Sequence, residues 1–230
     1  MDIAGLQKNT LLDYPGKIAC TVFLAGCNLR CPFCHNPSLV LPGRAESPAM
    51  GEEELLAFLK KRRGLLEGVC ITGGEPTLHR DLRSLIGKIS ALGYPVKLDT
   101  NGTNPKMLRQ LLEAGLLSYV AMDIKNAPEA YAETCGGADV VEQVEESVKI
   151  LRNAGIPYEF RTTVVKPLHS VDSMKALGQW LSGAEAYFIQ NFRDTGDLVG
   201  QGLSAFSQEE LKQLQKAVLP YLPNAQVRGI

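Results

Sequence analysis

Three cysteines, Cys27, Cys31 and Cys34, follow one another with three residues between the first pair and two between the second. Thiolates are soft ligands that suit iron-sulfur clusters or zinc, and a loop this short can place three sulfurs around one face of a cubane cluster. The fourth iron of such a cluster would then have no protein ligand. Because an open metal position is where a substrate can bind, three cysteines favour catalysis over a closed structural site.

A structural zinc site, a disulfide and a ferredoxin-type cluster are the alternative interpretations of these thiols. Zinc would need a fourth ligand, and His35, the candidate nearby, would close a cramped chelate beside Cys34. A disulfide is disfavoured because crowded thiols without a secretory signal are typical of a reduced, cytosolic protein. A ferredoxin-type cluster would need a fourth cysteine. Cys20 and Cys70 lie in apolar runs where a thiol usually packs as a small hydrophobe, whereas Cys135 in a predicted loop stays open as a candidate.

A glycine pair and a carboxylate form a second candidate ligand element. Gly73 and Gly74 lack side chains, so a backbone there can approach a ligand and offer carbonyl oxygens to an ammonium group, with the carboxylate of Glu75 nearby. A strand-to-helix turn also uses such residues routinely. The run by itself is therefore compatible with a plain turn.

Charged residues at the ends of predicted strands form a third group. Asp99 and Asp123 follow neighbouring strands, and two buried carboxylates placed together would be costly unless they shared a cation. The alternative is that Asp99 belongs to a turn and that Asp123 pairs with Lys125 at the surface. Arg161 suits a ligand carboxylate, because its guanidinium fork can bind in a bidentate way.

The elements that must position these residues alternate along the chain as short apolar strands and amphipathic helices, which indicates an α/β fold with a parallel sheet. We predict strands at residues 18–24, 69–72, 96–99, 119–124, 158–165 and 186–190. We predict helices at residues 52–63, 81–92, 105–114, 140–153, 171–181 and 207–219. In a parallel barrel the loops after the carboxyl ends of the strands meet at one mouth. Every predicted strand here is followed by polar or glycine-rich residues, so we expect the candidate residues to meet there.

Size and charge narrow the class of protein. A chain of 230 residues with 45% hydrophobic content can bury one core, so we predict a single domain of residues 1–230. The net charge is −1 and the longest basic run, at residues 60–63, lies on a predicted helix, so we expect no nucleic-acid partner. No apolar stretch approaches the ~20 residues that cross a bilayer. We therefore expect no membrane partner and a cytoplasmic location.

The cysteine run resembles the signature of radical S-adenosylmethionine (SAM) enzymes, and Gly-Gly-Glu-Pro at residues 73–76 resembles the element of that family that meets the SAM amino group. The resemblance implies a partial parallel (β/α)6 barrel and a 4Fe-4S cluster in a loop at residues 26–36. It also implies that Phe33 packs against the adenine, that Gly73 to Glu75 and Arg161 bind SAM, and that SAM is cleaved reductively to methionine and a 5′-deoxyadenosyl radical.

Within that superfamily the sequence is most similar to the glycyl-radical-enzyme activases, in particular the longer type of anaerobic ribonucleoside-triphosphate reductase activating protein. The residues that carry this are the run at 5–17, Asp-Thr-Asn-Gly at 99–102 and Asp-Ile-Lys at 123–125. The implied substrate is a glycine of a large partner enzyme, the anaerobic ribonucleoside-triphosphate reductase. The implied electron donor is a flavodoxin or a ferredoxin-type protein.

Similarity to the pyruvate formate-lyase activating enzyme implies further roles for the charged residues. Asp99 and Asp123 would hold a monovalent cation together with backbone oxygens of Thr100 and Ala121. Lys125 would reach the SAM side of the pocket and act with the three cysteines in catalysis.

Two departures and three alternatives accompany this interpretation. The end of the sixth strand has Asn-Phe-Arg at 191–193 where the formate-lyase activase has a histidine near SAM, and the extra cysteine sets of auxiliary clusters are absent from the sequence.

Residues 126–140 are a candidate mobile segment at the mouth, although a plain connecting loop fits them as well. The alternatives are an activase of another glycyl-radical enzyme, another radical SAM enzyme such as a 7-carboxy-7-deazaguanine synthase-like one, and a non-catalytic iron-sulfur electron carrier, which would leave residues 73–75 unexplained.

Overall fold

A curved, mostly parallel sheet is the centre of the fold. The computed structural model describes residues 2–41, 48–194 and 196–228, and eight strands within these ranges join in the order β10-β9-β8-β7-β6-β5-β3-β2. Only the β2–β3 pair is antiparallel. The strands are β2 (Gly5–Thr10), β3 (Ala19–Leu24), β5 (Gly68–Gly73), β6 (Val96–Thr100), β7 (Tyr119–Asp123), β8 (Tyr158–Val164), β9 (Tyr187–Asn191) and β10 (Gln226–Arg228). A separate ladder pairs β1 (Asp2–Ile3) with β4 (Met50–Gly51).

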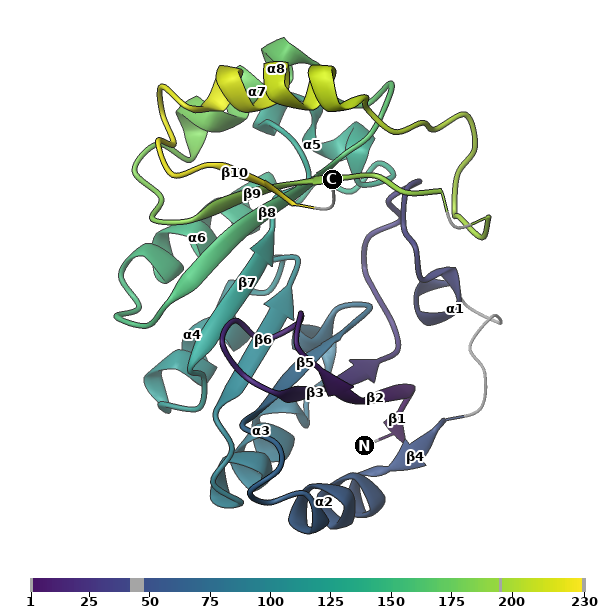
Figure 1. Ribbon diagram of the computed structural model, residues 1–230, viewed down its shortest axis with the longest axis vertical. Helices are drawn as coiled ribbons and strands as arrows, with labels where there is room; N and C mark the ends of the chain where they lie inside the picture. The colour runs from purple at the N-terminus through teal and green to yellow at the C-terminus, as the bar shows by residue number, and fades with distance from the viewer. Residues whose placement is uncertain (1, 42–47, 195, 229–230) are drawn as a thin grey trace.

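Helices cover the convex side of this sheet, which curves like an open letter C (Figure 1). They are α2 (Glu52–Lys61), α3 (Leu82–Ala91), α4 (Pro105–Glu113), α6 (Val141–Arg152), α7 (Val171–Trp180) and α8 (Gln208–Val218). Two shorter helices, α1 (Pro37–Val40) and α5 (Pro128–Thr134), and a 3-10 turn (Pro76–Leu78) complete the described part. The predicted α/β class with a partial parallel barrel is confirmed.

Local sequence accounts for most of these elements. Parallel strands that are covered by helices become continuous apolar runs, and Val69, Ile71 and Val96 are fully buried in this way. Helix α8 begins with a capping box in which Ser207 and Glu210 each accept a hydrogen bond from the other's backbone N–H. Each predicted strand and helix occurs within about two residues of its expected ends.

Residues 126–140 differ from the expectation of a mobile segment or a plain loop. Seven of them form α5, and the Tyr131 side chain is fully buried. The C-terminal end of α5 packs on the cysteine loop, since the Arg30 N–H donates to the Cys135 carbonyl oxygen over 3.0 Å. A Cβ atom on Gly136 would lie 2.5 Å from the carbonyl oxygen of Arg30. The segment is therefore packed against the cysteine loop and supports it from outside the cavity. None of the described helices has the length and apolar character needed to cross a membrane.

Candidate functional site

A cavity of about 200 Å³ lies at the carboxyl ends of the parallel strands. Of the eleven predicted site residues, ten line it; Glu75 does not. The ten are Cys27, Cys31, Phe33, Cys34, Gly73, Gly74, Asp99, Asp123, Lys125 and Arg161. Because parallel strands run in one direction, their following loops meet at one mouth, and residues distant in sequence become neighbours.

The cysteine loop follows β3 and brings three thiols to one wall of the cavity. The backbone N–H of Leu29 donates to the Cys27 sulfur over 3.4 Å, and the Asn101 side-chain amide donates to the same sulfur over 3.8 Å. Burial raises the pKa of the Cys27 and Cys34 thiols. Such N–H donors stabilise a thiolate, which is the form that binds metal.

The third thiol, Cys31, has a sulfur neighbour that was left open by the sequence. The fully buried thiol of Cys135 donates a hydrogen bond to the Cys31 sulfur, and this bond lowers the pKa of Cys31 to about 7. The same bond, together with burial, raises the pKa of Cys135 well above its usual range. The pair therefore favours the thiolate at Cys31 over the thiolate at Cys135.

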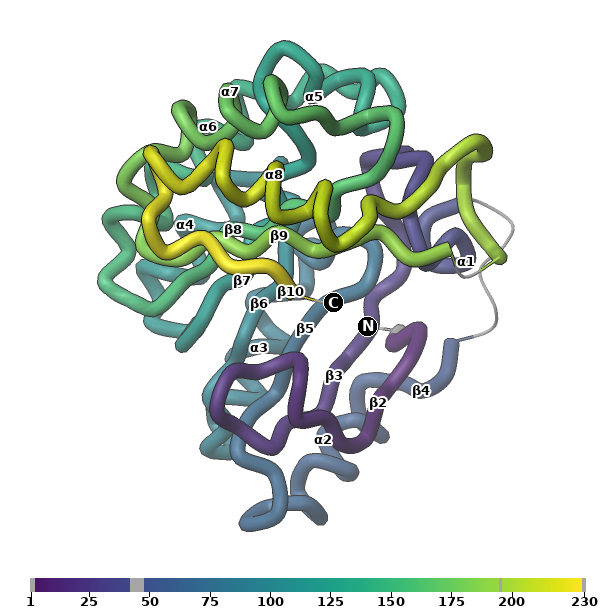
Figure 2. The backbone as a smooth tube through the Cα atoms, turned by 45° about the horizontal axis from the view of Figure 1, so that its top comes forward, coloured from purple at the N-terminus to yellow at the C-terminus, as the bar shows by residue number. Residues whose placement is uncertain are grey.

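The β9–α8 connection lies beside the cysteine loop (Figure 2). The Gly200 N–H donates to the Pro32 carbonyl oxygen over 2.8 Å. The imidazole of His35 stacks on Phe192, with ring centroids 5.5 Å apart, and burial lowers the pKa of His35. Asn191 is held by the backbone of Phe206. A ring from the cysteine loop, with a pKa that favours its neutral form, therefore lines the cavity.

The glycine pair allows β5 to end against the cysteine loop. A Cβ atom on Gly74 would lie 2.1 Å from the carbonyl oxygen of Gly26, and one on Gly73, whose φ is 130°, would lie 2.1 Å from that of Leu24. The Gly74 N–H donates to the Leu24 carbonyl oxygen over 2.8 Å, and the Glu75 N–H donates to the Gly26 carbonyl oxygen over 2.7 Å. Only glycine fits this close approach.

The Glu75 carboxylate is fully buried and is satisfied by the protein, in contrast to the expectation that it lies beside the ligand. It accepts hydrogen bonds from the backbone N–H of Thr77 at 3.0 Å, the hydroxyl of Thr100 at 2.7 Å and the backbone N–H of Asn101 at 2.6 Å. Burial raises the pKa of Glu75, and these donors oppose the rise. Glu75 therefore ties the end of β5 to the end of β6.

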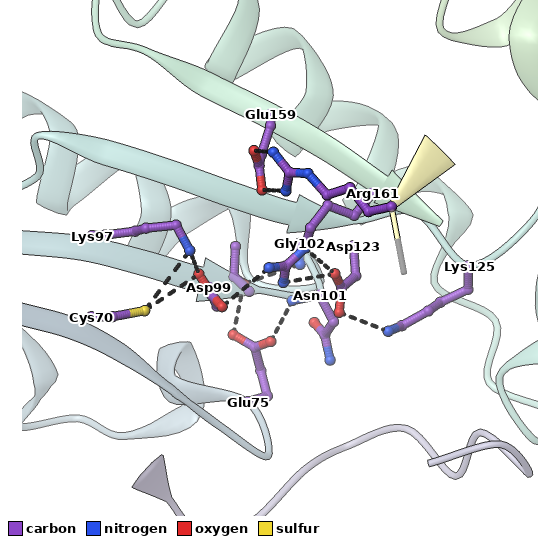
Figure 3. Close-up of polar contacts among 12 residues, drawn as sticks. Cys70, Glu75, Lys97, Asp99, Asn101, Gly102, Asp123, Lys125, Glu159 and Arg161 are labelled. Carbon is purple, nitrogen blue, oxygen red and sulfur yellow. Dashed lines mark hydrogen bonds and ion pairs between the residues drawn. The ribbon is translucent and has the colours of Figure 1, made fainter. Parts of the chain in front are cut away.

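A row of charged side chains runs from Lys97, beneath the floor of the cavity, to Lys125, which lines it (Figure 3). Arg161 lies between the two aspartates, 2.9 Å from Asp123 and 3.3 Å from Asp99. Lys125 contacts the second oxygen of Asp123 at 3.0 Å, and Lys97 pairs with Asp99. Although burial alone would raise the pKa of Asp123, the charges of Arg161 and Lys125 hold it well below its usual range.

The contacts around the cavity show whether its side chains fit the two predicted metal groups, a 4Fe-4S cluster and a monovalent cation. A 4Fe-4S cluster takes one thiolate at each of three irons, and the three thiols on one cavity wall supply that donor set. Across residues 2–41, 48–194 and 196–228, no three His, Cys, Asp or Glu side chains are grouped as ligands of a single metal ion. A monovalent cation between Asp99 and Asp123 does not fit, because side-chain cations already contact both oxygens of each carboxylate.

Three residues with a place in the site were missed or underrated from the sequence. Asn101 contacts the Cys27 sulfur and follows directly on Asp99-Thr100, so its position after a strand was a usable signal. His169 is buried beneath Phe33, with ring centroids 6.4 Å apart, and Lys97 is buried behind Asp99. The last two carry no local signal, because one lies in a loop and the other is a lysine within a strand.

A comparison with known families bears on this geometry. Residues 21–181, which include every predicted site residue, match the family model of the radical SAM superfamily. The chain belongs to the radical SAM superfamily. Membership implies a 4Fe-4S cluster and SAM, and the radical SAM cavity described above provides three thiols and a floor rich in cations for them.

Relatives of this radical SAM protein cover it to different extents. A Methanocaldococcus jannaschii protein whose name assigns it provisionally to the glycyl-radical enzyme activating enzymes is 30% identical over 238 residues, covering 99% of this chain and 96% of its own. A 7-carboxy-7-deazaguanine synthase of Thermococcus kodakarensis is 29% identical, covering 76% and 74%. The structure of Streptococcus suis SuiB bound to S-adenosylmethionine has a TM-score of 0.69 at 17% identity, over 91% of this chain and 52% of SuiB, which supports the fold alone.

Proposed function

We propose that this radical SAM protein is a glycyl-radical-enzyme activase and that its substrate is a glycine of an anaerobic ribonucleoside-triphosphate reductase. The observation that carries the proposal is the match to the Methanocaldococcus jannaschii protein over 99% of this chain and 96% of that one. The choice of partner rests on the resemblance to the reductase activating proteins, which residues 5–17, 99–102 and 123–125 carry. A flavodoxin or a ferredoxin-type protein is the proposed electron donor.

In this proposal each wall of the cavity has one task. Cys27, Cys31 and Cys34 hold the cluster, which when bound supplies the electron that cleaves SAM. The carbonyl oxygens at the end of β5, of Gly73 and Gly74, accept from the SAM amino group. These roles use groups that line the same cavity.

The remaining residues orient SAM and exclude water. Arg161 and Lys125 attract its carboxylate, since both are cations at the cavity floor and only about one-sixth of each side chain is exposed. Phe33, 4% exposed, packs against the adenine and keeps solvent away from the reacting carbon. The substrate glycine enters from the open mouth of the cavity.

A second candidate is a synthase that acts on a small molecule, as the 7-carboxy-7-deazaguanine synthases do by name. The observation in its favour is the 29% identity to the Thermococcus kodakarensis protein. That match covers 76% of this chain, against 99% for the activase-like relative, which is why we favour the activase. The two functions differ in whether the hydrogen atom comes from a protein or from a small molecule.

Electron paramagnetic resonance tests the proposal. The holoenzyme, reconstituted and reduced without oxygen, is mixed with SAM and with the anaerobic ribonucleotide reductase from the same source. We expect a protein-centred glycyl doublet. A cluster signal that changes on adding SAM, without the doublet, would reject this partner, and a signal indifferent to SAM would leave the electron carrier.

Two cysteine variants control this experiment. Cys31→Ala removes one of three thiolates, so the doublet should disappear together with most of the bound iron. Cys20→Ala removes a thiol that lies in β3 outside the cavity, where burial raises the pKa of Cys20 to about 12, and it should keep both signals. Loss of the doublet in both variants would show that unfolding, and not the cluster, is responsible.

A further inference from the structure

A lysine buried inside the barrel has no part in the function proposed above. The Lys97 side chain is 2% exposed and projects from β6 beneath the cavity floor. The strand register places it between Cys70 of β5 and Tyr119 of β7. Its ammonium lies 3.8 Å from the Cys70 sulfur and 5.9 Å from the Tyr119 ring centroid. A buried ammonium is costly unless it is paired, so its partner is informative.

That partner is the Asp99 carboxylate. Lys97 pairs with one oxygen of Asp99, while the guanidinium of Arg161 contacts the other oxygen at 3.3 Å. Figure 3 shows Lys97 reaching Asp99 from the side opposite to Lys125. Lys97 does not line the cavity, so it neutralises Asp99 from behind and takes no space that a ligand needs.

Both oxygens of the second carboxylate, that of Asp123, also contact side-chain cations. Arg161 donates to one oxygen of Asp123 through Nε at 2.9 Å, and Lys125 contacts the other oxygen at 3.0 Å. The set of five side chains holds three cations and two anions, and its net charge is therefore +1. An inorganic cation added between the aspartates would meet three positive charges within a few ångströms and no unoccupied carboxylate oxygen.

We infer that Lys97 is a built-in counter-ion that replaces an inorganic monovalent cation at the Asp99–Asp123 pair, so that SAM binding by this protein needs neither potassium nor sodium. Lys97 is a positioning residue, because it acts on the ligand through Asp99 and Arg161. By neutralising Asp99 it leaves the positive charge of Arg161 available to the SAM carboxylate. The inference rests on SAM as the ligand of the family and not on the identity of the partner enzyme.

Anaerobic calorimetry of SAM binding to the holoenzyme tests the inference without the partner. Binding is measured in potassium chloride and in tetramethylammonium chloride at equal ionic strength, since tetramethylammonium is too large for a site between two carboxylates. We expect the two dissociation constants of the wild type to agree within about twofold. Wild-type binding that is lost in tetramethylammonium would overturn the inference.

Variants of Lys97 give the matched comparison. Lys97→Met should weaken SAM binding about tenfold in tetramethylammonium and regain most of it in potassium, because an emptied carboxylate site can then take the ion. Lys97→Arg keeps a charge and should stay independent of the salt cation. Lys149→Met removes a lysine of an exposed pair with Glu145 on α6 and should behave as the wild type. If SAM binding to Lys97→Met is as independent of potassium as it is in the wild type, Lys97 does not replace an inorganic cation.

Thermal unfolding of the wild-type holoenzyme without oxygen provides a readout that does not depend on the stability of Lys97→Met. A cation that binds only the folded state raises the unfolding midpoint. The inference expects the same wild-type midpoint in both salts. A higher midpoint in potassium would reveal a cation site and would overturn it.

Discussion

The imidazole of His169 shows how one side chain outside the cysteine motif holds the site together. It is 4% exposed, donates from Nε2 to the Lys125 carbonyl oxygen over 2.8 Å, and accepts at Nδ1 from the Val165 N–H over 3.2 Å. Its ring also contacts Phe33 edge-on. Acceptance at Nδ1 requires the neutral ring, and burial lowers the pKa of His169 below 6.5. A single neutral histidine thus positions the backbone of Lys125 and the ring of Phe33.

The stability of the protein should therefore depend on pH through His169. Because the folded-state pKa lies below the unfolded value of 6.5, the unfolded chain takes up a proton first, and the contribution of His169 is lost as the pH falls below 6.5. We expect His169→Gln to lower the free energy of unfolding by about 1–3 kcal/mol at neutral pH and by less at acidic pH. Urea unfolding of the cluster-free protein at pH 7.5 and 5.5 measures the difference. His35 is present in both proteins, so its own titration cancels in the comparison. A difference in the free energy of unfolding that is the same at pH 7.5 and 5.5 would contradict this account.

At the scale of elements, the site depends on how closely β5 approaches the cysteine loop. Two backbone hydrogen bonds, from Gly74 and Glu75 to Leu24 and Gly26, join the end of β5 to the start of that loop. The buried carboxylate of Glu75 then joins β5 to the end of β6. These contacts set the positions of the cavity walls before any ligand binds.

A methyl group at the junction should separate these walls. Gly74→Ala would place a Cβ atom 2.1 Å from the carbonyl oxygen of Gly26, so we expect SAM binding to weaken by about tenfold or more and the unfolding midpoint to fall. The matched control is Gly87→Ala in α3, where a Cβ atom meets open space and should leave binding unchanged while stabilising the helix by about 1 kcal/mol. Calorimetry with SAM and thermal unfolding measure both effects. Wild-type affinity in Gly74→Ala would show that the close approach is dispensable.

At the scale of the whole molecule, the far end of the sheet is held by its last strand. Arg228 of β10 makes two hydrogen bonds, at 3.0 and 2.9 Å, to Glu159 of β8, across the intervening strand β9. Glu159 is 1% exposed and also accepts from the Tyr119 hydroxyl at 3.0 Å. The Arg228 guanidinium lies 3.2 Å from the centroid of the Phe188 ring. The C-terminal strand thus covers and neutralises a buried carboxylate of the barrel.

Removing that cover should destabilise the whole domain. We expect Arg228→Met to lower the free energy of unfolding by about 2 kcal/mol, because Glu159 is left as a buried charge with one neutral donor. Adding Glu159→Gln should recover part of the loss, since the amide carries no charge. Arg109→Met, which breaks an exposed pair with Glu146, should cost about 0.5 kcal/mol or less. Urea unfolding of the wild type, the two single variants and the double variant measures these free energies. Equal losses of stability in Arg228→Met and Arg109→Met would refute the argument.

Much of the architecture was accessible from the sequence because its signals are local. Apolar runs, helical periodicity and caps such as Ser207 lie within a few residues, and the six predicted strands and six predicted helices occur in the structure. The strands β1, β2, β4 and β10 and the helices α1 and α5 were not predicted. They are short or lie at sheet edges, where pairing with distant residues and not local pattern determines the conformation.

The sequence by itself determined which residues reach the cavity, since the spacing of the cysteines and the single direction of parallel strands bring ten predicted residues to one wall or floor. Only the tertiary structure decided which group each of them meets: Lys97 behind Asp99, Arg161 beside Asp123, and Cys135 against Cys31. The reason is register. Asp123 lies opposite Arg161 in adjacent strands, and a slip of one residue would turn either side chain to the other face of the sheet.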